Sequence, residues 1–207
     1  MLIITADDFG LWPSYDAGMM EAVRAGAVDA VSVMVLRGSP VPEKLRRWDG
    51  AVGLHLEAAP GGDLRGRGEV ERQLGAFAEL VGRPADYLDG HHHCHAEPAV
   101  AGAVAELAAE LDLPVRSVGE EHRVLLRAAG VRTPDRLIGR YEESDPVVPA
   151  ELDAVAPGWT EWMVHPGRAD PTSGSSYDAG REEDLMALLR LELPPGPARS
   201  DHRHLPR

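Results

Sequence analysis

The amino-acid sequence predicts an α/β protein whose parallel strands form either a β/α barrel or an open doubly wound sheet. Short apolar runs alternate along the chain with segments whose apolar residues recur at helical spacing, and this alternation is typical of a mostly parallel sheet. The length of 207 residues suits one domain with a sizeable core, so we expect a single domain over residues 1–207. No glycine-rich phosphate motif follows any strand, which removes the main sequence support for a nucleotide-binding sheet.

The first half of the chain predicts strands and helices in alternation. Leu2–Ala6 is apolar and β-branched and predicts a buried first strand. Asp16–Ala25 carries apolar residues on one face and predicts a helix, which Gly26 would end. The same criteria predict the elements that follow, namely a strand at Val28–Leu36, a short helix at Glu43–Trp48, a strand at Ala51–Leu56, a helix at Glu69–Val81 and a strand at Tyr87–Asp89.

The second half of the chain gives a less regular pattern. Glu97–Leu111 predicts a helix, because Pro98 stands at a good helix-start position and apolar residues follow at helical spacing. Thr160–Val164 predicts a strand that ends at an HPG turn. The remaining predicted elements are a strand at Val115–Val118, a helix at Val124–Ala129, a strand at Leu137–Tyr141 and a helix at Arg181–Leu191. The Pro-rich tail, residues 193–207, is assigned to no element.

Acidic residues outnumber basic ones, 34 to 21, for a formal net charge of -13. A field of this sign repels phosphate backbones and anionic membranes, so we expect neither nucleic acid nor a membrane as partner. It favours a bound cation and a neutral or cationic substrate. The single cysteine, Cys94, excludes an internal disulfide, and the sequence has neither a signal-peptide pattern nor an apolar run near the ~18–20 residues that span a bilayer. We therefore expect a cytoplasmic protein.

Side chains that bind metals or move protons follow four of the predicted strands. In β/α barrels the carboxyl ends of the strands converge on one face, so residues distant in sequence meet there. The candidates are Asp7 and Asp8 after the first strand, His55 at the end of the third, Asp89 with His91, His92, His93 and His95 after the fourth, and His165 after Thr160–Val164.

Such a set has the parts that amide hydrolysis requires. One carboxylate and two imidazoles suit zinc or a similar divalent ion, which lowers the pKa of a bound water towards ~7. A second carboxylate can take the proton of that water, and a histidine can protonate the leaving nitrogen. Structural alternatives remain open: Asp7 and Asp8 could form a turn and helix cap, and His55 could be a hydrogen-bonded core residue. Cys94 is interpreted as a packing residue, because no second cysteine supports a zinc finger.

Five segments carry a resemblance to a known family. They are TADDFGL at the start, EAVRAG in the first helix, then VGLHL, GRPADYLDGHHHCH and EWMVHPG, in that order between Met1 and Gly167. With them the sequence resembles the YdjC-like family of carbohydrate deacetylases. The resemblance implies an irregular TIM-like (β/α) barrel, one divalent metal ion, magnesium or zinc, and hydrolysis of the N-acetyl group of an amino sugar or short oligosaccharide.

The resemblance also implies roles for individual residues. Asp8, His55 and His91 match the metal ligands of the family, Asp7 matches the general base, and His165 matches a histidine that acts as an acid or orients the substrate. We further expect four residues to bind substrate, namely Trp12, Asp89, His93 and Arg116, with the Trp12 ring stacked on a small sugar. In the alternative interpretation, Trp12 only packs against its neighbours. The sequence also leaves open whether the protein forms a homodimer.

This sequence departs from the family pattern around the substrate face. Trp12 and Pro13 stand where the family has a small polar residue, Asp16 where it often has asparagine, and Gly90 where serine is common. Two other functions therefore stay open. A metal-dependent phosphoesterase could use the same barrel, although few basic residues stand beside these motifs, and a catalytically weakened carbohydrate-binding homologue could keep the pocket.

Overall fold

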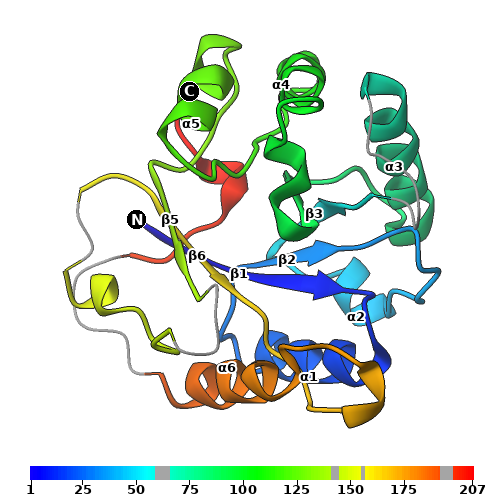
Figure 1. The fold of residues 1–207 in the computed structure, drawn as a ribbon, viewed down its shortest axis with the longest axis vertical. Helices are drawn as coiled ribbons and strands as arrows, with labels where there is room; N and C mark the ends of the chain where they lie inside the picture. The colour runs from blue at the N-terminus through cyan, green and yellow to red at the C-terminus, as the bar shows by residue number, and fades with distance from the viewer. Residues whose placement is uncertain (59–65, 141–144, 155–156, 192–197) are drawn as a thin grey trace.

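The computed structural model describes residues 1–58, 66–140, 145–154, 157–191 and 198–207. Its centre is a curled sheet of six parallel strands in the order β4-β3-β2-β1-β6-β5 (Figure 1). The strands are β1 (Leu2–Phe9), β2 (Ala30–Val33), β3 (Ala51–Leu56), β4 (Leu88–Gly90), β5 (Arg136–Gly139) and β6 (Thr160–Val164). The first strand of the chain therefore lies in the middle of the sheet, between β2 and β6.

Helices cover the outer side of the sheet. α1 and α6 lie side by side, and α4 lies between α3 and α5 (Figure 1). The helices are α1 (Pro13–Arg24), α2 (Glu43–Arg46), α3 (Gly66–Val81), α4 (Ala101–Glu110), α5 (Glu120–Ala128) and α6 (Asp178–Arg190), with short 3₁₀ turns η1 (His91–Ala96), η2 (Ala150–Ala154), η3 (Pro171–Ser173) and η4 (His202–His204). Among the described helices, none combines the length and apolar character needed to cross a bilayer.

The two faces of the sheet carry different side chains, because successive residues of a strand point to opposite faces. On the outer face, apolar side chains such as Ile4, Val31 and Leu54 join the helices in one hydrophobic core. The inner face carries a smaller apolar cluster that includes Ile3 and Tyr87. It also carries buried, mutually hydrogen-bonded polar side chains, which are Thr5, Asp7, Ser32, His55, Asp89 and Glu161. The chemistry of the protein is concentrated on this face.

β4 and β5 form the edges of the sheet, and irregular chain partly fills the gap between them. The Leu88 amide of β4 donates to the Pro114 carbonyl at 2.9 Å, and the Arg116 amide donates to the Leu88 carbonyl at 3.1 Å. The Val115 amide in turn donates to the Arg132 carbonyl at 3.0 Å. No strand of the described residues completes the ladder from β4 to β5, so the observed architecture is a curled parallel sheet with open edges.

The predicted elements agree best with the structure where the apolar run is short and bounded. The strands predicted at Ala51–Leu56 and Thr160–Val164 coincide with β3 and β6. The strand predicted at Val28–Leu36 is too long, since β2 ends at Val33. Its last residues leave the ladder, and the Leu36 amide donates instead to the Glu57 carboxylate at 3.0 Å.

Two predictions after β4 were wrong in extent. The helix predicted at Glu97–Leu111 begins only at Ala101, because the histidine segment forms η1 and a turn precedes the helix. The strand predicted at Val115–Val118 is reduced to one bridge with β4. Tyr141, the last residue of the strand predicted at Leu137–Tyr141, lies outside the described residues.

Candidate metal and catalytic site

An irregularity at the end of β1 brings two consecutive carboxylates to the same site. Neighbouring residues of a regular strand point to opposite faces, yet Asp7 and Asp8 line the same cavity. The pairing register of β1 with β2 shifts between Ala6 and Phe9, and Asp8 has a φ of 75°, in the left-handed region. A bulge of this kind redirects side chains. Aspartate tolerates this backbone conformation better than most residues, so the residue type suits the geometry.

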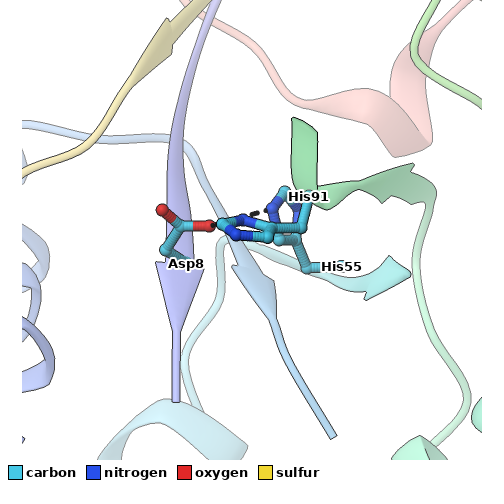
Figure 2. A group of neighbouring side chains, drawn as sticks. All are labelled: Asp8, His55 and His91. Atoms are coloured by element: carbon cyan, nitrogen blue, oxygen red, sulfur yellow. Dashed lines mark hydrogen bonds and ion pairs between the residues drawn. The ribbon is translucent and has the colours of Figure 1, made fainter. Parts of the chain in front are cut away.

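Asp8 lies at the centre of a cluster with two histidines. Its Oδ1 atom is 3.1 Å from His55 Nε2 and 2.8 Å from His91 Nδ1. Figure 2 shows both rings directed at this carboxylate, with His55 on β3 and His91 at the start of η1. One ligand atom from each residue lies within 4.8 Å of the other two. A carboxylate and two imidazoles at this spacing form a donor set that fits a divalent ion.

Arg181 at the start of α6 holds the other oxygen of Asp8. Its Nη2 atom donates to Asp8 Oδ2 at 2.6 Å, and its guanidinium lies over the Tyr15 ring, 4.3 Å from the centroid. Burial alone would raise the pKa of Asp8. Hydrogen bonds from the two histidines and the charge of Arg181 nevertheless hold the pKa of Asp8 well below its usual value. These contacts favour the ionised form of Asp8 and orient its carboxylate.

Asp7 forms a buried bidentate ion pair with Arg116. Arg116 Nη1 is 2.5 Å from Asp7 Oδ2, and Nη2 is 2.8 Å from Asp7 Oδ1. Burial would raise the pKa of Asp7, but the Arg116 guanidinium outweighs it and the pKa is lowered. Arg116 also contacts Asp89 Oδ2 at 2.9 Å and Glu161 Oε1 at 2.8 Å. One fully buried arginine thus organises three carboxylates.

The electrostatic potential at the cluster favours a cation. His55 Nδ1 contacts Asp89 Oδ1 at 2.8 Å, which leaves Nε2 directed at Asp8. Burial would lower the pKa of His55, but the charges of Asp89 and Asp7 raise it to about 10. With His55 neutral, as a metal ligand must be, four buried carboxylates and two buried guanidiniums at the site leave an excess of two negative charges; they are Asp7, Asp8, Asp89, Glu161, Arg116 and Arg181. A divalent ion would neutralise this excess.

His165 follows β6 and lines the same cavity. Its backbone amide donates to Asp184 Oδ2 at 2.9 Å, and its ring meets the Tyr177 ring edge-on, with centroids 5.6 Å apart. The Tyr177 hydroxyl donates to Asp184 at 3.2 Å, so one carboxylate fixes both residues. Burial lowers the pKa of His165, which favours its neutral form. Its Nδ1 atom is buried without a hydrogen-bond partner among the described residues.

These residues surround a cavity of about 960 Å³. Trp12 and His93 are two of the four residues expected to bind substrate, and both line it. Trp12 Nε1 donates to Asp170 at 3.1 Å. Asp89 and Arg116 do not line it. Both are fully buried behind Asp7 and His55, where they contact other protein groups and no open space. The structure therefore separates the four residues expected to bind substrate into two that face the cavity and two that lie behind it.

The sequence-based selection missed several residues. Arg181 and Tyr177 line the cavity but stand in a polar region of the sequence that carries no local signal. Glu161 could have been noticed, because it is a carboxylate inside the apolar run TEWMV. Cys94 agrees with the packing interpretation: its Sγ atom lies 3.1 Å from the Leu56 carbonyl oxygen, and burial raises the pKa of the thiol to about 12.

Comparisons with known proteins agree with the motif pattern. A sequence model of the family described as YdjC-like protein matches residues 1–64 and 66–194. The chain is 31% identical over 219 residues to a carbohydrate deacetylase of Geobacillus stearothermophilus, covering 90% of this chain and 88% of that protein. It is 34% identical over 142 residues to a human carbohydrate deacetylase, covering 51% of this chain and 44% of that protein. This second match spans less than half of the human protein.

Two further comparisons concern function and fold separately. A chitooligosaccharide deacetylase of Serratia marcescens is 28% identical over 166 residues, with 65% of each chain covered. A crystal structure from Enterococcus faecalis, described as a putative cellobiose-phosphate cleavage protein, superposes with a TM-score of 0.75 at 24% identity and covers 93% of this chain and 91% of that chain. At this identity the structural match shows a shared fold.

Proposed function

Because the chain belongs to the YdjC-like protein family, we propose that it is a metal-dependent carbohydrate deacetylase that hydrolyses the N-acetyl group of an amino sugar or short oligosaccharide. The observation that carries the proposal is the cluster of Asp8, His55 and His91, which lies beside a second carboxylate in one cavity. The carbohydrate and chitooligosaccharide deacetylases among its relatives support the same reaction class.

Asp8, His55 and His91 would hold the metal ion. When bound, a divalent ion supplies an activated water and polarises the acetyl carbonyl. Two neighbouring side chains orient these ligands, since Arg181 holds the Asp8 carboxylate and Asp89 fixes the His55 ring so that Nε2 faces the site. Two imidazoles favour zinc over magnesium, and elemental analysis of the purified protein would identify the ion.

Asp7 would act as the general base. A carboxylate offers about four lone-pair positions, and Arg116 occupies two of those on Asp7. Ser32 Oγ contacts Oδ1 at 3.3 Å. A position facing the cavity therefore remains to accept the proton of the attacking water. We propose that Arg116 fixes the direction of Asp7 and does not contact the substrate.

His165 would act on the leaving nitrogen or orient the acetyl group. It lines the cavity with Asp7 and Asp8, and the Asp184 contact fixes its backbone. The aromatic rings of Trp12 and Tyr177 line the same cavity and offer faces on which a pyranose can stack. A cavity of about 960 Å³ suits a monosaccharide or disaccharide unit, so we propose a small, neutral N-acetylated sugar as substrate.

The charges that line the cavity favour a deacetylase over a phosphoesterase. Three arginines line it, and each has a carboxylate partner: Arg37 contacts Glu57, Arg140 contacts Glu183, and Arg181 contacts Asp8. The carboxylates partly neutralise the arginine charges, which weakens the attraction for a phosphate ester. A neutral sugar does not depend on that attraction.

We also propose that the chain is one domain and that its sheet is an irregular TIM-like barrel. The contacts from Leu88 to Pro114 and Arg116, and from Val115 to Arg132, support this architecture, because they bring irregular chain across the gap between β4 and β5. Small-angle scattering and limited proteolysis would test the single domain. Two separately stable fragments would contradict it.

The function is tested by acetate release. The protein is stripped with a chelator, reloaded with zinc or magnesium, and assayed with N-acetylated monosaccharides, disaccharides and longer chito-oligosaccharides. We expect metal-dependent acetate release, lost in Asp8→Asn and retained in Glu71→Gln, a control at an exposed position on α3. Release of phosphate from simple esters, with no acetate from any sugar, would contradict the proposal.

A further inference from the structure

The C-terminal segment, residues 198–207, closes the end of the sheet opposite the metal-binding cluster. It pairs with the start of β1: the Leu2 amide donates to the Ala198 carbonyl at 3.0 Å, and the Ser200 amide donates to the Leu2 carbonyl at 3.0 Å. Figure 1 shows this segment in red beside the first residues of β1. Leu205 then packs into the apolar cluster of the inner face, with Ile3 and Tyr87. Asp201, His202 and Leu205 of this segment are thus part of the protein interior.

His202 is the residue of this segment that lies deepest. Its side chain is fully buried, and its ring stacks on Tyr87 with centroids 3.8 Å apart and an interplanar angle of 8°. Tyr87 is itself fixed, because its ring occupies the space above Gly53, where an added Cβ would lie 2.5 Å from it. His202 Nε2 contacts Glu161 Oε1 at 3.1 Å. Stacking and hydrogen bonding therefore give the histidine one defined position.

Glu161 connects His202 to Arg116. Its Oε1 atom accepts hydrogen bonds from Thr5 Oγ1 at 2.8 Å, from Arg116 Nε at 3.0 Å and from Arg116 Nη2 at 2.8 Å. The adjacent edge of the same guanidinium, Nη1 and Nη2, donates to both oxygens of Asp7, so Nη2 is shared between the two carboxylates. Glu161 and Asp7 thus hold neighbouring edges of one arginine, and the tail reaches the proposed base through two intervening side chains.

We propose that His202 is a positioning residue for the deacetylation, which acts through Glu161 and Arg116 to keep Asp7 aligned with the metal-binding cluster. The inference rests on the proposed function. Glu161 has no solvent to replace a lost hydrogen bond, because it is fully buried and its Oε2 atom has no partner among the described residues. Removal of the His202 donor would let Glu161 and Arg116 relax, and a small displacement of a catalytic group is costly in rate.

Three variants test the proposal. His202→Phe keeps an aromatic ring on Tyr87 but removes the donor, and His202→Gln restores a side-chain N–H. Leu205→Ala loosens the same segment and leaves His202 intact. We expect His202→Phe to lower kcat about 10-fold with KM and bound metal unchanged, as for other residues that support catalytic groups from behind. His202→Gln should recover most of kcat, and Leu205→Ala should lower the unfolding temperature but keep kcat.

Crystal structures of the wild type and of His202→Phe give a readout that does not depend on turnover. We expect the bidentate contact between Arg116 and Asp7 to be altered in the variant. An unchanged contact with an unchanged kcat overturns the proposal, as does an equal loss of kcat in Leu205→Ala at the same folded fraction. Absence of acetate release by the wild type is a different result, because it contradicts the proposed function while the crystal structures still decide the role of His202.

Discussion

Asp7 and Asp8 are adjacent residues with different partners, and this difference predicts separable defects. Asp7 pairs with Arg116, whereas Asp8 contacts the two histidines and Arg181. Asp7→Asn should therefore retain the metal and lose about 10²–10⁴-fold in kcat, the usual contribution of a positioned base. Asp8→Asn should lose the metal itself. Metal content by elemental analysis and kcat from acetate release measure the two effects, and near-full activity of Asp7→Asn would make Asp7 a structural residue.

Asp16 is a residue whose charge opposes folding. Its carboxylate accepts a hydrogen bond from the Gly10 amide at 2.6 Å, but burial raises the pKa of Asp16 to about 6. The folded state binds this proton more tightly than the unfolded state, so the contribution to stability falls as the pH rises from about 4 to about 6. Asp16→Asn keeps an acceptor for Gly10 and cannot ionise.

We therefore expect Asp16→Asn to be more stable than the wild type above pH 6, by about 1–2 kcal/mol once partial exposure is taken into account. The difference should disappear below about pH 4, where both forms are neutral. Urea unfolding at a series of pH values measures it. A constant difference across the whole range would show that ionisation of Asp16 is not its cause.

How far the sequence predicts the site depends on whether a residue carries a local signal. Asp8 and His55 lie near the carboxyl ends of β1 and β3, and His91 directly follows β4. Parallel strands bring their carboxyl ends to one place, so the meeting of these three residues was predictable. Arg181 and His202 reach the inner face only through packing of α6 and of the tail. The sequence around these two residues has no periodicity or motif that predicts their burial at the site. Arg116 was placed near the site by resemblance alone, and its burial behind Asp7 became visible only in the structure.

At the scale of elements, the contact between α1 and the turn after β6 is very close. A Cβ added at Gly18 would lie 2.6 Å from the Gly167 carbonyl carbon, and backbone cannot move as a flexible side chain can. This turn follows His165 directly. Gly18→Ala should therefore lower stability by about 1–3 kcal/mol and also reduce activity, because α1 would push the turn away.

Gly75 provides the matched control. It lies within α3, where an added Cβ would meet nothing within 4 Å. Gly75→Ala should raise stability by about 0.5–1 kcal/mol, since alanine is the better helix former, and leave activity unchanged. Thermal unfolding and acetate release measured on both variants separate the close approach at Gly18 from a general effect of alanine. Equal effects of Gly18→Ala and Gly75→Ala on stability and activity would show that the close approach at Gly18 is not the cause.

The element boundaries show the same division between local and tertiary information. β3 and β6 were predicted to the residue, because each is a short apolar run bounded by polar residues or turns. β2 was predicted too long, since nothing local in VDAVSVMVL indicates that Leu36 pairs with the Glu57 side chain. The bulge at Asp8 is also invisible in the sequence, because it depends on how β1 pairs with β2.

At the scale of the whole molecule, the buried charge excess predicts that the metal contributes to stability. When the histidine ligands are neutral, four buried carboxylates at the site stand against two guanidiniums, and a divalent ion bound only by the folded state shifts the unfolding equilibrium. At a free metal concentration of 100 times Kd the gain is about 2.7 kcal/mol, which corresponds to roughly 5–10 °C in the unfolding temperature. Calorimetry with and without a chelator measures it, and Asp8→Asn should abolish the shift.

The central place of β1 has a consequence for synthesis of the protein. Its residues Leu2–Ala6 pair with residues 160–164 of β6, and Leu2 also binds the tail at Ala198. Because β6 is synthesised long after β1, one edge of β1 stays unpaired until residues 160–164 have been made. Contacts this distant in sequence make folding slow. Until then, the unpaired edge of this apolar strand can associate with other chains. The yield of folded protein should therefore depend on translation rate and on chaperones, and not on native stability alone.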